Sequence, residues 1–309
     1  MKILVTGGKG YIGAITAQEL IKNNHQVVIY DKKSGQEIQD TKLLEKVIKE
    51  EKIEAVMHFA AFIEMGESME QPAKYFDNNL VGSQHLIHTM VNTGVKYLIF
   101  SSSAGVYGNP LRIPIKEDDR KLPENPYGQS KWMTEQLLEF YDRTDDIKSI
   151  SLRYFNACGA TEHSGENHQP ESHLIPNVIK AILENKEFIL FGNDYPTKDG
   201  TCIRDYIHVL DLTKAHILAL EALVSGHKSD VYNVGTGRGY SNLEVIKMAE
   251  KVSGKKLKVK VAPRRPGDAN ELVADSTKIQ KDLGWRPKYS DLETIISTAW
   301  QWHSQHQNP

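Results

Sequence analysis

The sequence predicts an α/β protein built around a doubly wound, mostly parallel β-sheet. Five short apolar runs have the length and the β-branched character of buried strands, at residues 2–6, 26–30, 55–59, 97–101 and 149–154. Longer amphipathic segments alternate with them and predict helices over residues 10–23, 40–52, 72–93 and 127–144. Strands that are apolar throughout and alternate with helices are typical of a parallel sheet covered on both faces.

The chain divides into two unequal parts. Residues 1–155 carry the alternating pattern and predict a nucleotide-binding domain, to which segments near 202–212 and 231–237 return. Residues 156–309 contain shorter elements interrupted by Pro, Gly and Asp, and predict a smaller α/β domain that mainly binds substrate. A complete doubly wound half places a helix and a third strand after the second strand. Residues 32–39 are too few for both, so we expect that strand to be missing or reduced to a vestige at residues 36–38.

Composition excludes several classes of partner and location. The net charge of −2 gives no overall field that favours nucleic acid or a membrane surface, and no apolar run of 18 residues occurs. The short basic run at residues 255–260 is interpreted as a solvated strand edge. The two cysteines, Cys158 and Cys202, form no metal-binding spacing, and the chain opens in a strand rather than a signal peptide. We therefore expect a cytoplasmic protein without a metal.

A glycine-rich loop follows the first strand. Gly7, Gly10 and Gly13 have the spacing of a tight strand-to-helix turn, in which free N–H groups of the helix face a pyrophosphate. Asp31 lies at the end of the second strand, where a carboxylate can accept hydrogen bonds from a ribose diol. A turn-capping Asp is the alternative interpretation of this residue. The loop indicates a Rossmann-like dinucleotide site, and the carboxylate favours NAD over NADP, although Lys32 and Lys33 weaken that preference.

Tyr127 and Lys131 form a candidate catalytic pair. They are four residues apart on a predicted helix that Pro126 can begin, so both side chains lie on one face. The strand at 97–101 leads into Ser101-Ser102-Ser103, which places hydroxyls at the ligand-binding edge of the sheet. Tyrosine has a pKa of roughly 10 and needs a shift of about 3 units to act as a base near neutral pH. A neighbouring ammonium and a cationic nicotinamide can supply that shift, so the pattern indicates hydride and proton transfer.

Further motifs reveal a resemblance that covers nearly the whole chain. In the first half they are Thr6-Gly7-Gly8-x-Gly10-Tyr11-Ile12-Gly13, His58-Phe59-Ala60-Ala61, Gly66-Glu67-Ser68, Asp77-Asn78-Asn79, Ser101-Ser102-Ser103-Ala104-x-Val106-Tyr107-Gly108 and Pro126-Tyr127-Gly128-x-Ser130-Lys131. In the second half they are Leu152-Arg153-Tyr154-Phe155-Asn156, Phe191-Gly192-Asn193-Asp194-Tyr195, Asp199-Gly200-Thr201-x-x-Arg204-Asp205-Tyr206-Ile207-His208 and Ala262-Pro263-Arg264-Arg265-x-Gly267-Asp268. With these motifs the chain resembles the extended short-chain dehydrogenase/reductase superfamily, and within it the UDP-glucose (UDP-galactose) 4-epimerases.

The resemblance implies an activity and a set of site residues. It implies that tightly bound NAD oxidises C4 of a UDP-sugar and returns the hydride to the opposite face. The implied catalytic residues are Ser103, Tyr127 and Lys131. With the glycine loop, the expected cofactor-binding residues are Gly7, Gly10, Tyr11, Ile12, Gly13, Asp31, Lys32, Glu37, Ile38, Phe59, Ala60, Asn78, Ser101, Tyr127, Lys131 and Tyr154. The expected UDP-sugar-binding residues are Ser103, Tyr127, Asn156, His173, Leu174, Phe191, Arg204, Arg265, Asp268 and Leu272. A homodimer formed through the helices at 72–93 and 127–144 is also implied by the family alone.

Four departures from the family pattern bear on these expectations. Ile63 replaces the usual lysine, Gly105 replaces a threonine near the sugar, and Leu272 replaces a tyrosine that narrows the sugar pocket. The deletion after Asp31 removes an Asp-Ile pair that cradles adenine, for which Glu37-Ile38 can substitute. The shortened adenine pocket leads us to expect that NAD is lost more easily.

Several alternatives remain open at this point. The active sugar can be another one, such as UDP-N-acetylglucosamine, and a weakly active or non-catalytic nucleotide-binding homologue is consistent with the deletion. A reductase or decarboxylase on the same scaffold also remains possible. A 4,6-dehydratase is disfavoured because Ala104-Gly105, rather than an acid pair, follows Ser103. Taken singly, Arg204 and Asp205 can be an ordinary ion pair, and Asn156 a turn residue.

Overall fold

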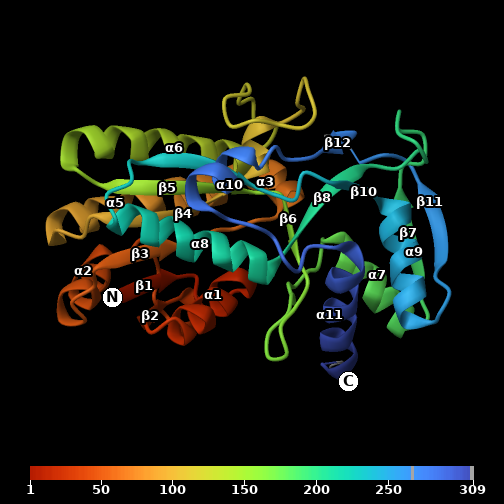
Figure 1. Cartoon of the computed structure of the whole chain (residues 1–309), viewed down its shortest axis with the longest axis horizontal. Helices are drawn as coiled ribbons and strands as arrows, with labels where there is room; N and C mark the ends of the chain where they lie inside the picture. The colour runs from red at the N-terminus through yellow and green to blue at the C-terminus, as the bar shows by residue number, and fades with distance from the viewer. Residues whose placement is uncertain (266–267, 307–309) are drawn as a thin grey trace.

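The computed structural model describes residues 1–265 and 268–306, and its centre is a six-stranded sheet (Figure 1). The strand order is β2-β1-β3-β4-β5-β9, and every neighbouring pair is parallel. The strands are β1 (Lys2–Thr6), β2 (Gln26–Tyr30), β3 (Ala55–His58), β4 (Tyr97–Ser103), β5 (Lys148–Tyr154) and β9 (Asp230–Val234). The predicted doubly wound parallel sheet is therefore confirmed, and the five predicted strands agree with β1 to β5 within two residues at each end.

Helices cover both faces of this sheet. On one face the helices are α1 (Tyr11–Lys22), α8 (Val209–Val224) and α10 (Thr277–Leu283), which enclose a core that includes Leu20, Leu220 and Trp285. On the other face they are α2 (Thr41–Glu50), α5 (Gly82–Thr93) and α6 (Pro126–Asp145), around a core that includes Leu44, Leu86 and Leu138. No helix in the described part of the chain is long and apolar enough to cross a membrane.

The segment after β2 is unusually short. A single 3₁₀ turn, η1 (Lys32–Ser34), and Gly35 with φ of 74° reverse the chain, which enters α2 six residues later. Residues 36–38 form no strand, so β2 is the edge of the sheet and β3 pairs directly with β1. The predicted absence of the third strand is confirmed, and no vestige of it remains as a strand. Ile38 is buried instead, against Gly82 at the start of α5.

The helix predicted at residues 72–93 is continuous but changes its winding. It begins as α4 (Pro72–Tyr75), passes through the π-helical turn η2 (Phe76–Val81) and continues as α5. A short helix, α3 (Met65–Glu70), precedes it, and a 3₁₀ turn, η3 (Ala104–Tyr107), follows β4. The π-helical turn contains Asn78, which lines the same cleft as the glycine loop; such turns often occur at functional sites.

The remaining elements form a smaller α/β region to one side of the sheet (Figure 1). One small sheet contains β6 (Asn156–Cys158), β8 (Ile203–His208), β10 (Gly239–Ser241) and β12 (Glu271–Leu272), and a two-stranded sheet pairs β7 (Glu187–Phe191) with β11 (Lys258–Ala262). The helices α7 (Leu174–Leu183), α9 (Asn242–Ser253) and α11 (Leu292–Gln305) share one core. Of the two segments predicted to return, 231–237 supplies β9. The segment 202–212 contains β8 of the small sheet and the first turn of α8.

Candidate active site

The loop between β1 and α1 brings its backbone close to the end of β3. Gly7 has φ of 70°, and a Cβ there would lie 2.7 Å from the backbone nitrogen of Ala60. A Cβ at Gly13 would lie 2.3 Å from the carbonyl oxygen of Gly7, so the helix can approach the strand only without side chains at these positions. Gly10 caps α1, whose first N–H groups have no partner within the helix and can bind an anion. The loop therefore fits a pyrophosphate.

A cleft continues from this loop along the edge of the sheet. Nine of the predicted cofactor residues line it, namely Gly7, Gly10, Asp31, Lys32, Glu37, Ile38, Phe59, Ala60 and Asn78. The sequence analysis did not select five further residues of its lining, which are Tyr30, Lys33, Gln36, Ala61 and Phe62. Glu37 and Ile38 thus take the place left by the missing strand, where the adenine pocket is expected. In the sequence, Glu37 and Ile38 could be selected only because they follow the deletion after Asp31.

Asp31 already fulfils the structural role that the sequence left open. Its two carboxylate oxygens accept hydrogen bonds from the backbone N–H groups of Lys9 and Lys33, each at 2.8 Å. It therefore caps the η1 turn and ties it to the glycine loop. Each carboxylate oxygen has a further lone pair, so a ribose hydroxyl can bind there as well.

The three predicted catalytic residues converge where β4 meets α6. Ser103 is the last residue of β4, while Tyr127 and Lys131 lie on the first turns of α6, and all three are buried. Asn125 caps this helix by accepting a hydrogen bond from the Gly128 N–H at 2.8 Å. Pro occupies the first turn, as expected. The i, i+4 spacing thus places the phenol and the ammonium on one buried face.

Burial has the largest influence on the pKa values of Tyr127 and Lys131. Burial raises the pKa of Tyr127, and hydrogen bonding to Ser103 only partly opposes that shift. Burial lowers the pKa of Lys131 to about 7, against an opposing influence of Glu135. The Lys131 ammonium donates to the Ser101 carbonyl at 2.7 Å and lies 5.9 Å from the centre of the Tyr127 ring. In the protein alone, desolvation therefore has the largest influence on the pKa of Tyr127; the expected lowering also requires the positive charge of the nicotinamide.

Gly105 leaves the space beside this trio open. A Cβ on Gly105 would lie 3.3 Å from the Ser103 Oγ and 3.8 Å from Cε1 of Tyr127. The Gly105 N–H also donates to the Ser103 Oγ at 3.0 Å, which holds that hydroxyl in place. Because the family threonine is absent, no side chain from this position contacts the phenol or the hydroxyl.

Tyr154 and Phe59 meet at a histidine that the sequence analysis missed. His216 of α8 hydrogen-bonds to the Tyr154 hydroxyl through Nε2 and to the Leu212 carbonyl through Nδ1 at 2.9 Å. Its ring centre lies 4.8 Å from that of Phe59. Burial lowers the pKa of His216 to about 4, so the ring is neutral at pH 7, with its proton on the nitrogen that faces the carbonyl. Its helix carried no recognised motif, so no sequence signal pointed to it.

A buried ion pair supports the catalytic strand and helix from behind. Arg153 of β5 lies 2.6 Å from Glu135 of α6, and both side chains are 3% exposed. Ser102 donates to the same carboxylate at 2.5 Å, and Tyr107 accepts from Arg153 at 2.7 Å. Arg153 and Tyr107 had appeared only as members of matching motifs. The network connects β4, β5 and α6 directly beneath Ser103.

The predicted substrate residues lie on the smaller region in three groups. Arg204 of β8 donates to the Ala269 carbonyl at 2.8 Å, lies 3.6 Å from Asp268 and is paired in register with Leu272. The Arg265 guanidinium covers the ring of Phe191, 4.1 Å from its centre. His173 and Leu174 lie at the start of α7.

The alternatives for two of these positions can now be compared with the structure. Asp205 accepts hydrogen bonds from the backbone N–H groups of Thr236, Gly237 and Ala274, at 2.8 to 3.2 Å. Arg204 makes its ion contact with Asp268, so the suggested Arg204–Asp205 pair is wrong. Asn156 begins β6, and its amide donates to the Asp205 carbonyl at 3.0 Å. It is therefore a strand residue rather than a turn residue.

Comparison with known proteins agrees with this geometry. Residues 3–235 match the NAD dependent epimerase/dehydratase family. The UDP-glucose 4-epimerase of Lactobacillus helveticus is 47% identical over 99% of this chain and 98% of its own. The crystal structure of UDP-glucose 4-epimerase from Brucella ovis in complex with NAD is 40% identical, with a TM-score of 0.94 over 97% of this chain and 98% of that one. The UDP-Glc/GlcNAc 4-epimerase of Campylobacter jejuni is also 40% identical, with a TM-score of 0.84 over 98% and 99% of the two chains. The chain belongs to the NAD dependent epimerase/dehydratase family.

Proposed function

We propose that this protein is an NAD-dependent UDP-glucose 4-epimerase, which interconverts UDP-glucose and UDP-galactose through a 4-keto intermediate. The observation that carries the proposal is the burial of Ser103, Tyr127 and Lys131 together at the junction of β4 and α6. Full-length similarity to proteins named UDP-glucose 4-epimerase supports this choice within the family. Because the same trio can serve other nucleotide-sugar oxidations, the sugar must be established by assay.

The nucleotide-binding part, residues 1–155, holds NAD in this proposal. The first turn of α1 binds the pyrophosphate, Asp31 the adenosine ribose, and Glu37 and Ile38 the adenine. Of the predicted residues outside the cleft lining, Tyr11, Ile12 and Gly13 belong to that first turn. The others, which hold the nicotinamide end, are Ser101, Tyr127, Lys131 and Tyr154. When bound, NAD takes up the hydride of C4 and returns it.

Tyr127 is the general base in this mechanism. Its phenolate accepts the proton of the C4 hydroxyl, and Ser103 donates a hydrogen bond that favours the phenolate over the phenol. Lys131 is held by the Ser101 carbonyl, beside the Tyr127 ring. Since burial opposes ionisation of Tyr127, Ser103 and the positive charges at the site must together offset that cost.

The smaller region, residues 156–309, mainly holds the UDP-sugar. Arg204 and Arg265 present guanidinium groups, which suit a diphosphate because they donate charge-assisted hydrogen bonds. The other proposed contacts to the nucleotide and the sugar are Asn156, His173, Leu174, Phe191, Asp268 and Leu272. They accompany Ser103 and Tyr127, which contact the sugar at C4.

UDP-N-acetylglucosamine is a second candidate substrate. Leu272 stands where family members with a narrow sugar pocket carry tyrosine, and it packs against the apolar cluster that contains Ala104 and Tyr107. Gly105 removes a further side chain near the sugar. Both changes leave space for a larger 2-substituent. Assays with UDP-galactose and UDP-N-acetylgalactosamine side by side distinguish the two substrates.

The decisive test is the variant Tyr127→Phe. We expect turnover of UDP-galactose to fall by roughly 10²–10⁴-fold, because the ring remains but the base is lost. Tyr289→Phe is the matched control, since that tyrosine is exposed and lies far along the chain in the segment before α11. The assay measures UDP-glucose formed by protein supplied with NAD. Unchanged turnover in Tyr127→Phe would contradict the mechanism, and no turnover of either sugar by the unaltered protein would contradict the epimerase assignment.

We further propose that the protein is a cytoplasmic homodimer. Two observations on α5 and α6 support an interface there. The apolar side chain of Phe140 is 60% exposed, and a groove between the two helices is lined by Gln84, His85, His88 and Tyr141. Both cysteines are free and buried, which suits a reducing compartment. Light scattering of the purified protein measures whether two chains associate.

A further inference from the structure

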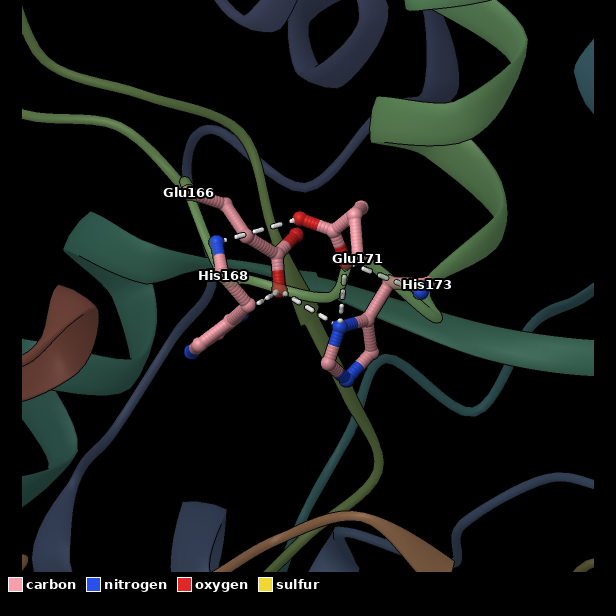
Figure 2. A group of neighbouring side chains, drawn as sticks. All are labelled: Glu166, His168, Glu171 and His173. Atoms are coloured by element: carbon pink, nitrogen blue, oxygen red, sulfur yellow. Dashed lines mark hydrogen bonds and ion pairs between the residues drawn. The ribbon is translucent and has the colours of Figure 1, made fainter. Parts of the chain in front are cut away.

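A second group of polar side chains lies outside the catalytic trio, on the loop between β6 and α7. Glu166, His168, Glu171 and His173 point toward one another, and one ligand atom from each lies within 4.8 Å of the others (Figure 2). Two imidazoles and two carboxylates at a common point are the ligand types that bind zinc. We propose that this cluster is a binding site for a divalent transition-metal ion, with zinc as the best match. The sequence analysis had expected no metal, because it searched for cysteine spacings.

The distances between the ligand atoms already suit such an ion. Oε1 of Glu166 lies 3.4 Å from Nδ1 of His168 and 3.1 Å from Nδ1 of His173. Nδ1 of His173 lies 2.9 Å from Oε1 of Glu171. Zinc binds nitrogen and oxygen ligands at about 2.1 Å, so two ligands of a tetrahedral ion lie about 3.4 Å apart. Small rotations of the side chains are therefore sufficient to admit the ion.

Glu166 provides an independent reason to expect a cation. Its side chain is only 6% exposed, and its carboxylate contacts the ring nitrogens of His168 and His173, at 3.4 and 3.1 Å. The facing Nδ1 of His168 is buried without a hydrogen-bond partner within residues 1–265 and 268–306. Buried ionisable groups are normally hydrogen-bonded or bound to a metal. An ion between these two atoms satisfies both.

Glu171 differs from Glu166 because the loop itself holds it. Its carboxylate accepts hydrogen bonds from the backbone N–H groups of Ser172 and His173, at 3.0 and 2.9 Å, and from that of His168 at 3.3 Å. The loop thus fixes one ligand in advance, which lowers the entropic cost of assembling the site. Its neighbour His173 immediately precedes the first turn of α7 and is similarly fixed.

The main alternative is a plain ion-pair cluster. Hydrogen bonding to Glu171 and the charge of Glu166 raise the pKa of His173 to about 9, despite its burial, so that a proton balances one of the two negative charges. A divalent ion balances both charges and displaces that proton when it binds. The two possibilities differ in what they predict for His168. Its ring makes only the 3.4 Å contact with Glu166 in the ion-pair cluster, whereas it is a ligand of the metal in the other case.

The position of the cluster suggests what the ion does. His168 meets the ring of Tyr11, edge to face at 6.5 Å, and the Tyr11 hydroxyl donates to the Gly159 carbonyl at 2.5 Å. A bound ion therefore joins the loop 159–173 to the start of α7, beside the cofactor loop. The inference goes beyond the proposed function. It assigns Nδ1 of His173, which we also proposed as a UDP-sugar contact, to the ion, and metal binding is measured without turnover.

The test is a zinc titration of tag-free protein that has been stripped with a chelator and then freed of it. A competing chromophoric chelator reports the free zinc, and we expect one tightly bound ion per chain. His168→Gln and Glu166→Gln should each weaken zinc binding by at least about tenfold, since each removes a ligand. His163→Gln and Glu162→Gln are matched controls, because both residues are exposed on the same loop and outside the cluster.

Two further measurements keep the proposal falsifiable. Zinc should raise the thermal transition of the unaltered protein but not that of His168→Gln, and circular dichroism checks that each variant is folded. X-ray absorption at the zinc edge should show two imidazole ligands with oxygen ligands at about 2.0–2.2 Å. Weak binding at less than one ion per chain means an adventitious ion only. Equal affinity in His168→Gln and His163→Gln would also overturn the proposal.

Discussion

Two opposing influences act on the pKa of Tyr127. Burial raises its pKa, whereas the hydrogen bond with Ser103 lowers it. Lys131, which the sequence analysis named with the nicotinamide as a source of the shift, donates a hydrogen bond from its ammonium to the Ser101 carbonyl. The hydroxyl of Ser103 is therefore the protein group that most directly favours the phenolate.

Replacing Ser103 should change the pH dependence of turnover in a defined direction. In Ser103→Ala the hydrogen bond is lost and burial acts unopposed, so the pKa of Tyr127 rises further. The limb of kcat that requires the phenolate should then move to higher pH, with a fall of roughly 10²-fold in kcat near neutral pH. Ser103→Thr keeps a hydroxyl and should retain most of the wild-type profile. An unshifted profile in Ser103→Ala would show that the hydroxyl does not tune the base.

Helix α6 is the element on which the site depends most. Its N-terminal turns present Tyr127 and Lys131, and its middle is anchored to β5 by Glu135 and Arg153. An ion pair that is almost fully buried repays its desolvation only while both partners are present. The same helix carries a second pair, Glu139 and Arg143, whose atoms lie 3.6 Å apart at the surface.

Breaking these two pairs should therefore have unequal effects. Glu135→Gln leaves the Arg153 charge buried and without its counter-ion, and should lower the free energy of unfolding by roughly 3–5 kcal/mol. Glu139→Gln removes a solvent-exposed partner and should cost less than about 1 kcal/mol. Urea denaturation of both variants measures the difference. Similar losses in the two variants would mean that the buried network does not hold α6 against the sheet.

At the scale of the whole molecule, the sequence predicted the nucleotide-binding half better than the smaller one. The central residues of β1 and β3 are apolar because these strands are buried on both faces, and the turn between β1 and α1 needs glycine. These constraints are local and can be read from neighbouring residues. The small sheet around β8 is formed by strands from residues 156–158, 203–208, 239–241 and 271–272, whose pairing is not encoded locally.

The candidate site shows the same division. Ser103, Tyr127 and Lys131 were predicted because strand end and helix start are sequence features. His216 and Glu135 were missed because their importance comes from what they contact across the fold. The burial that raises the pKa of Tyr127 in the protein alone could not be predicted either, since the sequence gives the spacing to Lys131 but not the extent of burial.

The missing strand beyond β2 affects the affinity of the molecule for its cofactor. β2 is an edge strand, and the short segment containing Gln36, Glu37 and Ile38 lines the cleft where we propose that adenine binds. Ile38 is 4% exposed and packs on Gly82, so it supplies the apolar wall that a regular strand would otherwise extend. Because the shortened segment offers less apolar surface than a regular strand, less apolar area is buried when the nucleotide binds. We therefore expect NAD to be bound less tightly.

Protein purified without added nucleotide should therefore contain well under one NAD per chain after dialysis, and added NAD should restore its turnover. Ile38→Ala removes part of the remaining wall; losing about 1–2 kcal/mol of apolar contact should raise the Kd for NAD by roughly 5- to 30-fold. Acid release and enzymatic assay measure the bound nucleotide, and titration with NAD gives the Kd. If one NAD per chain remains bound after dialysis, the prediction is wrong. The segment 36–38 would then fully replace the missing strand, and the deletion would not weaken NAD binding.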